Sequence, residues 1–144
     1  MFSRRNSVCT FAAFTVGALL LMSTTVTVGN ELVKLSGDQE VPPVETKASG
    51  KGIIVVDSDK SLKGEVTTTG IKGTAANMEV GRPGLNGPVL VPLTRNGGNA
   101  WSVPAGAKLS DTQYENYRAG RLYLNVHSVA HPEGEIRGQL KPEM

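Results

Sequence analysis

Hydrophobic and polar residues alternate along much of the chain after residue 30, a pattern that predicts β-strands with one face toward a core. Arg121–Ser128 shows it most clearly: aliphatic residues occupy positions 122, 124 and 126, whereas Tyr123, Asn125 and His127 face the other way. The other predicted strands are Asn30–Leu35, Gly52–Asp57, Leu62–Thr69, Thr74–Val80, Val89–Leu93, Ala100–Val103 and Gly134–Leu140.

Turn residues separate these segments and predict how they connect. Asp57–Lys60 is typical of a turn and makes the flanking segments a hairpin, and the last two strands are expected to pair across residues 129–133. The β-branched run Ile53–Val56 predicts a strand that is buried on both faces or lies near a bulge. Gly37–Pro43 must leave regular pairing because proline donates no ladder hydrogen bond, and Gly81–Pro88 is predicted to be a loop.

One short helix is predicted near residues 110–119. Ser110 and Gln113 have the spacing of a capping box, and Gly120 is placed to end the helix. Many short strands with frequent turns and a single helix favour an all-β sandwich or barrel.

The first 29 residues have the layout of a secretory signal peptide. Arg4 and Arg5 precede a mostly apolar run, Val8–Met22, and small residues follow. A membrane-spanning helix needs about 20 consecutive apolar residues, so we expect cleavage, after Gly29, rather than an integral anchor. An ordinary leader fits better than a twin-arginine signal. Residues 30–144 would then form one domain in the periplasm or outside the cell.

Composition narrows the function classes. The chain has 15 basic and 13 acidic residues, and two of the basic ones lie in the predicted leader, so the mature charge is balanced. The only cysteine, Cys9, also lies in the leader. These facts exclude a disulfide scaffold, a thiolate metal site, a cysteine nucleophile and a basic nucleic-acid binder.

Three stretches resemble the CHRD domain, a family named for chordin and also found in many exported bacterial proteins. They are Leu35–Val44, Leu85–Leu93 and Gly120–Ser128, the last followed by Pro132–Leu140. The resemblance spans nearly the whole mature chain. It implies an immunoglobulin-like or superoxide-dismutase-like antiparallel sandwich, with a poorly defined molecular role and no established catalytic mechanism.

The chain departs from the family in one respect. Family members usually carry a His-x-His pair on the strand before the Gly/Pro loop, where this chain reads Asn77-Met78-Glu79. Together with the Asn-Val-His motif, which ends here in His127, that pair would supply three imidazoles. A histidine-rich copper site of the superoxide dismutase kind therefore cannot be built.

Polar residues on the predicted outward faces are the candidate functional patch. Asn125, His127, Glu135 and Arg137 would share one face of two paired strands. Cross-strand pairs of this kind contribute about 0.2–1 kcal/mol each. A hydrogen-bonded ladder that fixes register is favoured over a ligand site. Asn77 and Glu79 complete the patch.

Metal binding is the main alternative. His127 and His131 are the only histidines, and Glu79 or Glu133 could add an oxygen ligand. Copper and zinc prefer three or four such ligands, and the strand position of His127 removes the helical spacing that would join it to His131. We therefore predict no cofactor, with copper or zinc as the alternative.

Catalysis has little support in the sequence. Asp111, a hydroxyl residue and His127 could form a notional triad, but no nucleophile-elbow spacing accompanies them. We predict an exported, non-catalytic β-sandwich, monomeric or weakly self-associating, that binds an envelope component, a protein or a small ligand through loops at one end. A periplasmic metal-binding protein is the alternative, and a hydrolase is a remote third.

Overall fold

The computed structural model describes residues 29–143, which form nine strands, one α-helix and one 3-10 turn. The predicted leader, except Gly29, lies outside the described residues. The elements are β1 (Gly29–Ser36), η1 (Gly37–Gln39), β2 (Ser49–Val56), β3 (Leu62–Thr69), β4 (Gly73–Val80), β5 (Val89–Pro92), β6 (Thr94–Arg95), β7 (Ala100–Ser102), α1 (Asp111–Arg118), β8 (Leu122–Ser128) and β9 (Ile136–Gln139).

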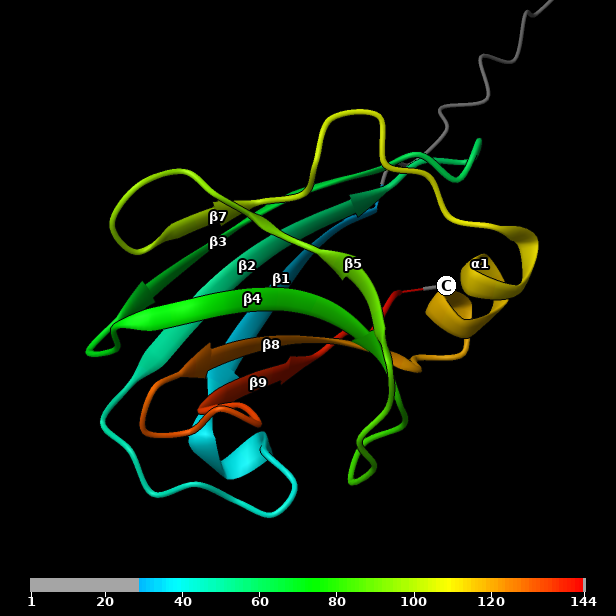
Figure 1. The fold of residues 1–144 in the computed structure, drawn as a ribbon. Helices are drawn as coiled ribbons and strands as arrows, with labels where there is room; N and C mark the ends of the chain where they lie inside the picture. The colour runs from blue at the N-terminus through cyan, green and yellow to red at the C-terminus, as the bar shows by residue number, and fades with distance from the viewer. Residues whose placement is uncertain (1–28, 144) are drawn as a thin grey trace, which may run out of the picture.

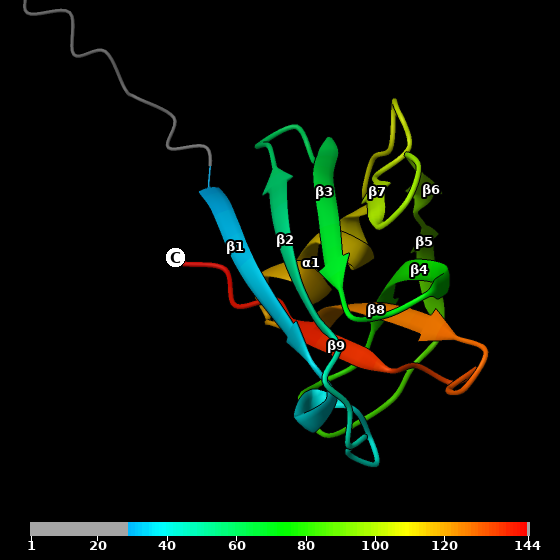
Figure 2. The same ribbon diagram turned by 90° about the vertical axis from the view of Figure 1, so that its left-hand side faces the viewer.

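The strands build an antiparallel sandwich that is nearly closed into a barrel (Figures 1 and 2). One layer has the order β5-β4-β8-β9 and the other has the order β1-β2-β3-β7-β6. A single residue pair, Ser36 with Arg137, joins β1 to β9. On the opposite side the chain passes between the layers at Leu93, between β5 and β6. The predicted all-β sandwich with one short helix is confirmed.

The core lies between the two layers. Leu122, Leu124 and Val126 of β8 are fully buried there and face Ile54 and Val66 of the other layer. Fully burying an aliphatic side chain of this size contributes about 1.5–3 kcal/mol, so this interface is the main source of stability. Trp101 of β7 is also buried, with the guanidinium of Arg95 stacked over its ring.

The predicted hairpin is β2 and β3, paired from Ser49 with Thr69 to Val56 with Leu62. The expectation that Ile53–Val56 is buried on both faces is wrong. Ile54 is fully buried, but Ile53 is 53% exposed, because the outer face of this layer is open to solvent and β2 alternates regularly instead of bulging.

The helix begins and ends as the sequence predicts. The Ser110 hydroxyl accepts from the Gln113 N–H, and the Gln113 side chain accepts from the Ser110 N–H, so both halves of the capping box are present. Gly120 follows in the left-handed region, with φ of 68°. No helix among residues 29–143 is long and apolar enough to cross a membrane.

Candidate functional site

A second buried region lies on the outer face of β4, β8 and β9, the face that sequence alternation assigns to solvent. Three loops cover it, at residues 40–48, 81–88 and 129–135. The six side chains that meet there, called the polar cluster below, are Glu40, Glu79, Tyr123, Asn125, His127 and Arg137. The side chains on this face are polar, as predicted, but the loops shield them from solvent.

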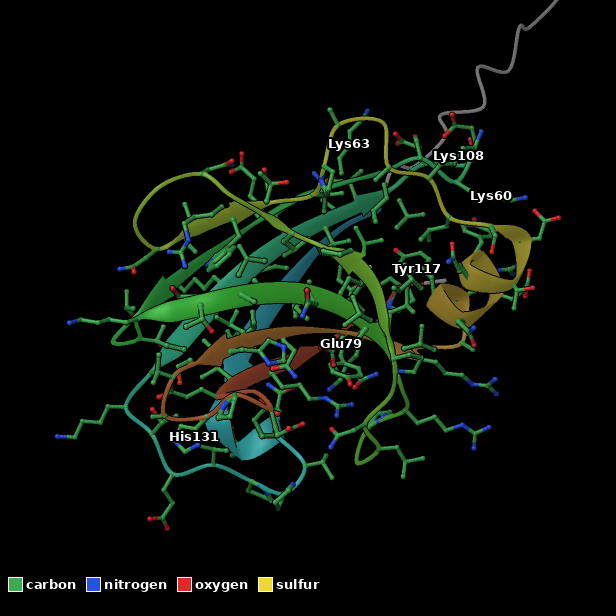
Figure 3. All side chains as sticks on the ribbon, viewed as in Figure 1. Lys60, Lys63, Glu79, Lys108, Tyr117 and His131 are labelled. Atoms are coloured by element: carbon green, nitrogen blue, oxygen red, sulfur yellow. The ribbon has the colours of Figure 1, made fainter. Side chains whose placement is uncertain are left out.

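Strand register places the members of the cluster. Asn125 of β8 lies between Asn77 of β4 and Arg137 of β9, so the three side chains form one row across the layer. Glu79 is opposite Tyr123 in the neighbouring row. Figure 3 labels Glu79 on its strand and His131 in the 129–135 loop.

His127 links the sheet to the 129–135 loop. Its Nδ1 lies 2.8 Å from the carbonyl oxygen of Pro132, which can only accept, so Nδ1 carries a proton. Its Nε2 lies 3.2 Å from Asn77 Nδ2 and 3.3 Å from Glu79 Oε1. The neutral ring therefore accepts from Asn77, and the protonated ring donates to Glu79. The hydrogen bond with Glu79 raises the pKa of His127 above 6.5.

Glu79 is buried but charged. Burial alone raises its pKa, but hydrogen bonds from His127, Tyr123 and Asn125 together outweigh burial and hold the pKa below 4.5. Burial, together with the hydrogen bond to Glu79, raises the pKa of Tyr123 to about 12. At neutral pH the cluster thus pairs an ionised Glu79 with a neutral phenol.

Arg137 is 1% exposed and ties the 81–88 loop to the sheet. One terminal nitrogen donates to the Leu85 carbonyl at 3.0 Å, and the other donates to the Arg82 carbonyl at 3.0 Å and to Gln139 Oε1 at 2.8 Å. The guanidinium also stacks 3.6 Å from the centre of the Tyr123 ring. A buried cation with this many acceptors fixes the conformation of the loop.

Glu40 is the member of the cluster whose carboxyl group is buried with one oxygen unpartnered. It is 5% exposed, and its Oε1 is buried without a hydrogen-bond partner in the described residues, as is Oδ1 of Asn125. Both oxygens lie within 2.7 Å of the position that a Cβ on Gly134 would take. Burial raises the pKa of Glu40 to about 7, although the charge of Arg137 lowers it. Glu40 is therefore protonated at mildly acidic pH and loses its proton only near neutral pH.

A cleft of about 350 Å³ opens beside the cluster, between residues 38–43 and 83–84. Glu40 and Arg137 contribute to its lining, and Val41, Pro43 and Pro83 supply apolar walls. The Asn86 side chain donates to the Val41 carbonyl at 2.7 Å and joins the two walls. This combination of apolar walls and a few buried polar groups is typical of small ligand sites.

The structure brings together Asn77, Glu79, Asn125 and His127 of the predicted patch, and Arg137 with them. Glu135 makes a different contact, since its Oε1 accepts from the Thr46 hydroxyl at 2.7 Å. Among the described residues, Glu135 pairs neither with Arg137 nor with His127, so the expected polar ladder does not include it: Arg137 donates to loop carbonyls, and His127 pairs with Glu79 of β4. The reason is that Glu135 precedes β9, whereas Arg137 lies under the 81–88 loop.

Sequence reasoning missed Glu40 and Tyr123. Glu40 lies in a loop 39 residues before Glu79 and has no periodic neighbour that would indicate its position. Tyr123 was placed on the outward face without a role. The burial of both depends on loops that alternation does not describe.

The donor set does not fit a copper or zinc site. In residues 29–143, no group of three or more His, Cys, Asp or Glu side chains is placed to hold a metal ion. Both ring nitrogens of His127 already have partners, and His131 uses its backbone, not its ring, to bond Ser128 and Gly134. That the protein takes no cofactor stays a prediction.

These features define the class: an antiparallel β-sandwich with a buried polar cluster under its loops. Comparison with family models gives a match to the CHRD domain over residues 32–140, and the chain belongs to that family. CHRD is not known as an enzyme family. Searches of curated proteins and of solved structures gave no match.

Proposed function

We propose that this protein is an exported, non-catalytic binding module of the cell envelope. Its ligand, which is a protein, a small molecule or another envelope component, would bind in the cleft between residues 38–43 and 83–84. The leader-like first 29 residues support export, and the balanced charge of the remainder disfavours a nucleic-acid ligand.

The contact of Arg137 with the 81–88 loop carries this proposal. Binding costs less free energy when the loops that make a site are already ordered. Here a fully buried guanidinium orders one wall through the Arg82 and Leu85 carbonyls, and Asn86 joins that wall to Val41 on the other. A purely structural loop would not need an adjoining cleft with apolar walls.

The environment of His127 favours binding over catalysis. A general base must reach the proton that it abstracts, yet the ring contacts the Pro132 carbonyl, the Glu79 carboxylate and the Asn77 amide, which are all groups of the protein itself. These partners hold the ring in place and keep it occupied. We infer a role in holding the 129–135 loop.

Position-specific photo-crosslinking in cells of the source organism tests the proposal. A benzoyl-phenylalanine at Val41, in the cleft wall, should give discrete adducts with an envelope component. The same group at Lys63, exposed on β3, serves as the control and should not. Arg137→Met should reduce the adducts from Val41.

Fractionation of the same cells and the mass of the mature N-terminus test export. Equal adducts from both positions, or a chain that keeps its first 29 residues inside the cell, would contradict the proposal.

A further inference from the structure

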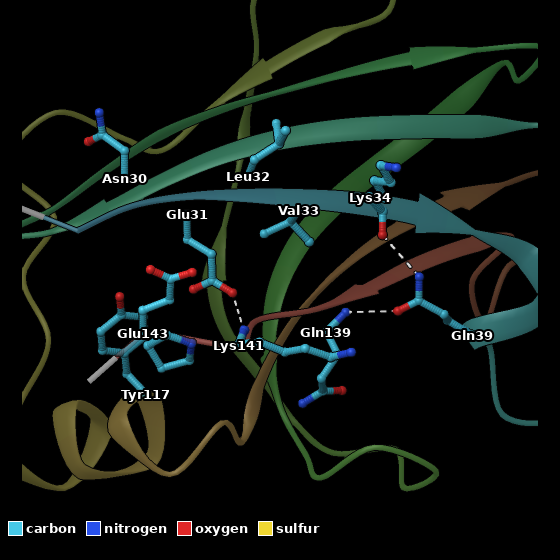
Figure 4. A pocket seen from close by; sticks show the side chains of 11 residues that line it. Asn30, Glu31, Leu32, Val33, Lys34, Gln39, Tyr117, Gln139, Lys141 and Glu143 are labelled. Carbon is cyan, nitrogen blue, oxygen red and sulfur yellow. Dashed lines mark hydrogen bonds between the residues drawn. The ribbon is translucent and has the colours of Figure 1, made fainter.

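A second, separate opening lies where the two layers of the sandwich part. β1 pairs with β2 along its whole length but with β9 only at Ser36 and Arg137. Beyond that pair a groove of about 610 Å³ opens, shown in Figure 4. Residues 30–34 of β1 line one side, Gln139 and residues 141–143 line the other, and Tyr117 of α1 contributes to the lining.

The side chain of Gln39 bridges β1 and β9 at one end of this groove. Continuing the antiparallel register from Ser36 and Arg137 would pair Lys34 with Gln139. Instead, Gln39 Nε2 donates to the Lys34 carbonyl at 3.0 Å, and Gln39 Oε1 accepts from the Gln139 N–H at 3.1 Å (Figure 4). The amide therefore supplies the two hydrogen bonds that β1 and β9 do not exchange with each other at this position. A Cβ on Gly138 would lie 2.7 Å from the Lys34 carbonyl oxygen, so the two strands are still close at this end, and the groove extends from here along residues 30–33.

The edge of β1 along the groove is unpaired. Because the Lys34 carbonyl points toward the groove, alternation directs the backbone groups of Leu32 and Asn30 the same way. Among the described residues, neither makes a backbone hydrogen bond on that side. A row of unpaired N–H and C=O groups is a template for another strand.

Glu31 gives the groove a charge preference. Its Oε1 accepts from the Lys141 N–H, and its Oε2 is buried without a hydrogen-bond partner in the described residues. Burial raises the pKa of Glu31. The other charged groups that line the groove are Lys34, Lys141 and Glu143, which are of both signs. A cation brought by an occupant would supply the partner that the Glu31 carboxylate lacks.

We propose that the groove accepts one extended segment of a partner protein, about five residues long, as an added strand between β1 and the C-terminal segment. A Lys or Arg of that segment pairs with Glu31. Main-chain hydrogen bonds from Leu32 and Asn30 give affinity, and the basic side chain gives selectivity. This surface differs from the loop cleft, although Gln39 and Gln139 line both openings.

The test uses a displayed library of random seven-residue peptides, selected against the full purified chain. Enriched peptides should be rich in β-branched residues and carry a Lys or Arg. A synthetic copy should slow hydrogen exchange at the Leu32 amide by at least tenfold. Replacing its basic residue by norleucine should weaken binding about threefold to tenfold in the parent and have no effect in Glu31→Gln.

Leu32→Pro and Leu32→Ala are the matched variants. Proline removes the N–H that faces the groove but leaves the ladder to β2, whereas alanine keeps that N–H. Leu32→Pro should lose at least tenfold in affinity, and Leu32→Ala should bind like the parent. If the proline variant does not fold, protection of the Leu32 amide in the parent decides the question.

Three outcomes would overturn the proposal. They are a library that yields no enriched peptide, peptides that leave exchange at Leu32 unchanged, and a concentration-dependent dimer that Leu32→Pro abolishes. The last would mean that a second copy of this chain occupies the groove. None of these outcomes depends on the crosslinking at Val41.

Discussion

Replacing Glu40 by glutamine should make the protein markedly less sensitive to pH. Glu40 is 5% exposed, has an unpartnered Oε1, and has a pKa raised to about 7 by burial. Glutamine has the same shape, cannot ionise, and offers an amide N–H₂ that can donate toward the unpartnered Oδ1 of Asn125.

The sign follows from the two states of the chain. The ordinary pKa of this carboxyl is 4.5, and in the folded protein it is higher, so between those values the folded state binds more protons than the unfolded one. The free energy of unfolding therefore falls as pH rises from about 4.5 through about 7. The full difference corresponds to about 3 kcal/mol, which partial solvent screening reduces to about 1–2 kcal/mol.

Urea unfolding at pH 5 and pH 8 measures this effect. The parent should lose about 1–2 kcal/mol more between these pH values than Glu40→Gln does. Glu45→Gln, an exposed carboxyl in the same loop, should follow the parent. The reasoning is refuted if Glu40→Gln and the parent show the same change with pH.

Three other substitutions test the contacts around the polar cluster. Arg137→Met should lower the free energy of unfolding by about 3–5 kcal/mol, because it leaves the buried Leu85 and Arg82 carbonyls without a donor and removes the positive charge near Glu40. The exposed control Arg121→Met should change it by no more than about 0.5 kcal/mol. A loss under about 1 kcal/mol for Arg137→Met, measured by urea unfolding, would contradict the role given to Arg137. Gly134→Ala should cost about 2 kcal/mol or more, because φ is 129° and a Cβ would lie 2.5 Å from Asn125 Oδ1; an unchanged melting temperature would argue against this crowding. His127→Ala should lower the free energy of unfolding by about 1 kcal/mol more at pH 5.5 than at pH 8.5. The reason is that the pKa of His127 is raised in the folded protein, so its protonation stabilises the fold below about pH 6.5, and this stabilisation is lost as pH rises through the pKa of the folded state. For this last variant, thermal unfolding without and with Cu(II) or Zn(II) is the measurement, and metal-dependent stabilisation of the parent alone would favour the metal-binding alternative.

Local sequence patterns predicted the elements well because each depends on neighbours in the chain. The capping box at Ser110 and Gln113, the glycine that ends α1, and the alternation along β8 all act within a few residues. Strand β6 was missed because Thr94–Arg95 is too short to show a period.

The candidate site was predictable only in part. Alternation correctly separated Asn125 and His127 from the core-facing leucines, and the family resemblance drew attention to Asn77 and Glu79. Neither signal predicted that the outward face of β8 is buried, because burial there depends on loops that return from distant parts of the chain.

By itself, therefore, the sequence determined most of the strands, the core-facing side of those that alternate clearly, and the family that the chain resembles. Only the tertiary structure decided that three loops fold over the polar face, that Glu40 and Arg137 meet there, and that Gln39 bridges β1 and β9. Strand periodicity is a property of the local backbone. The environment of a charged side chain depends on long-range packing, which changes its solvation and with it its pKa.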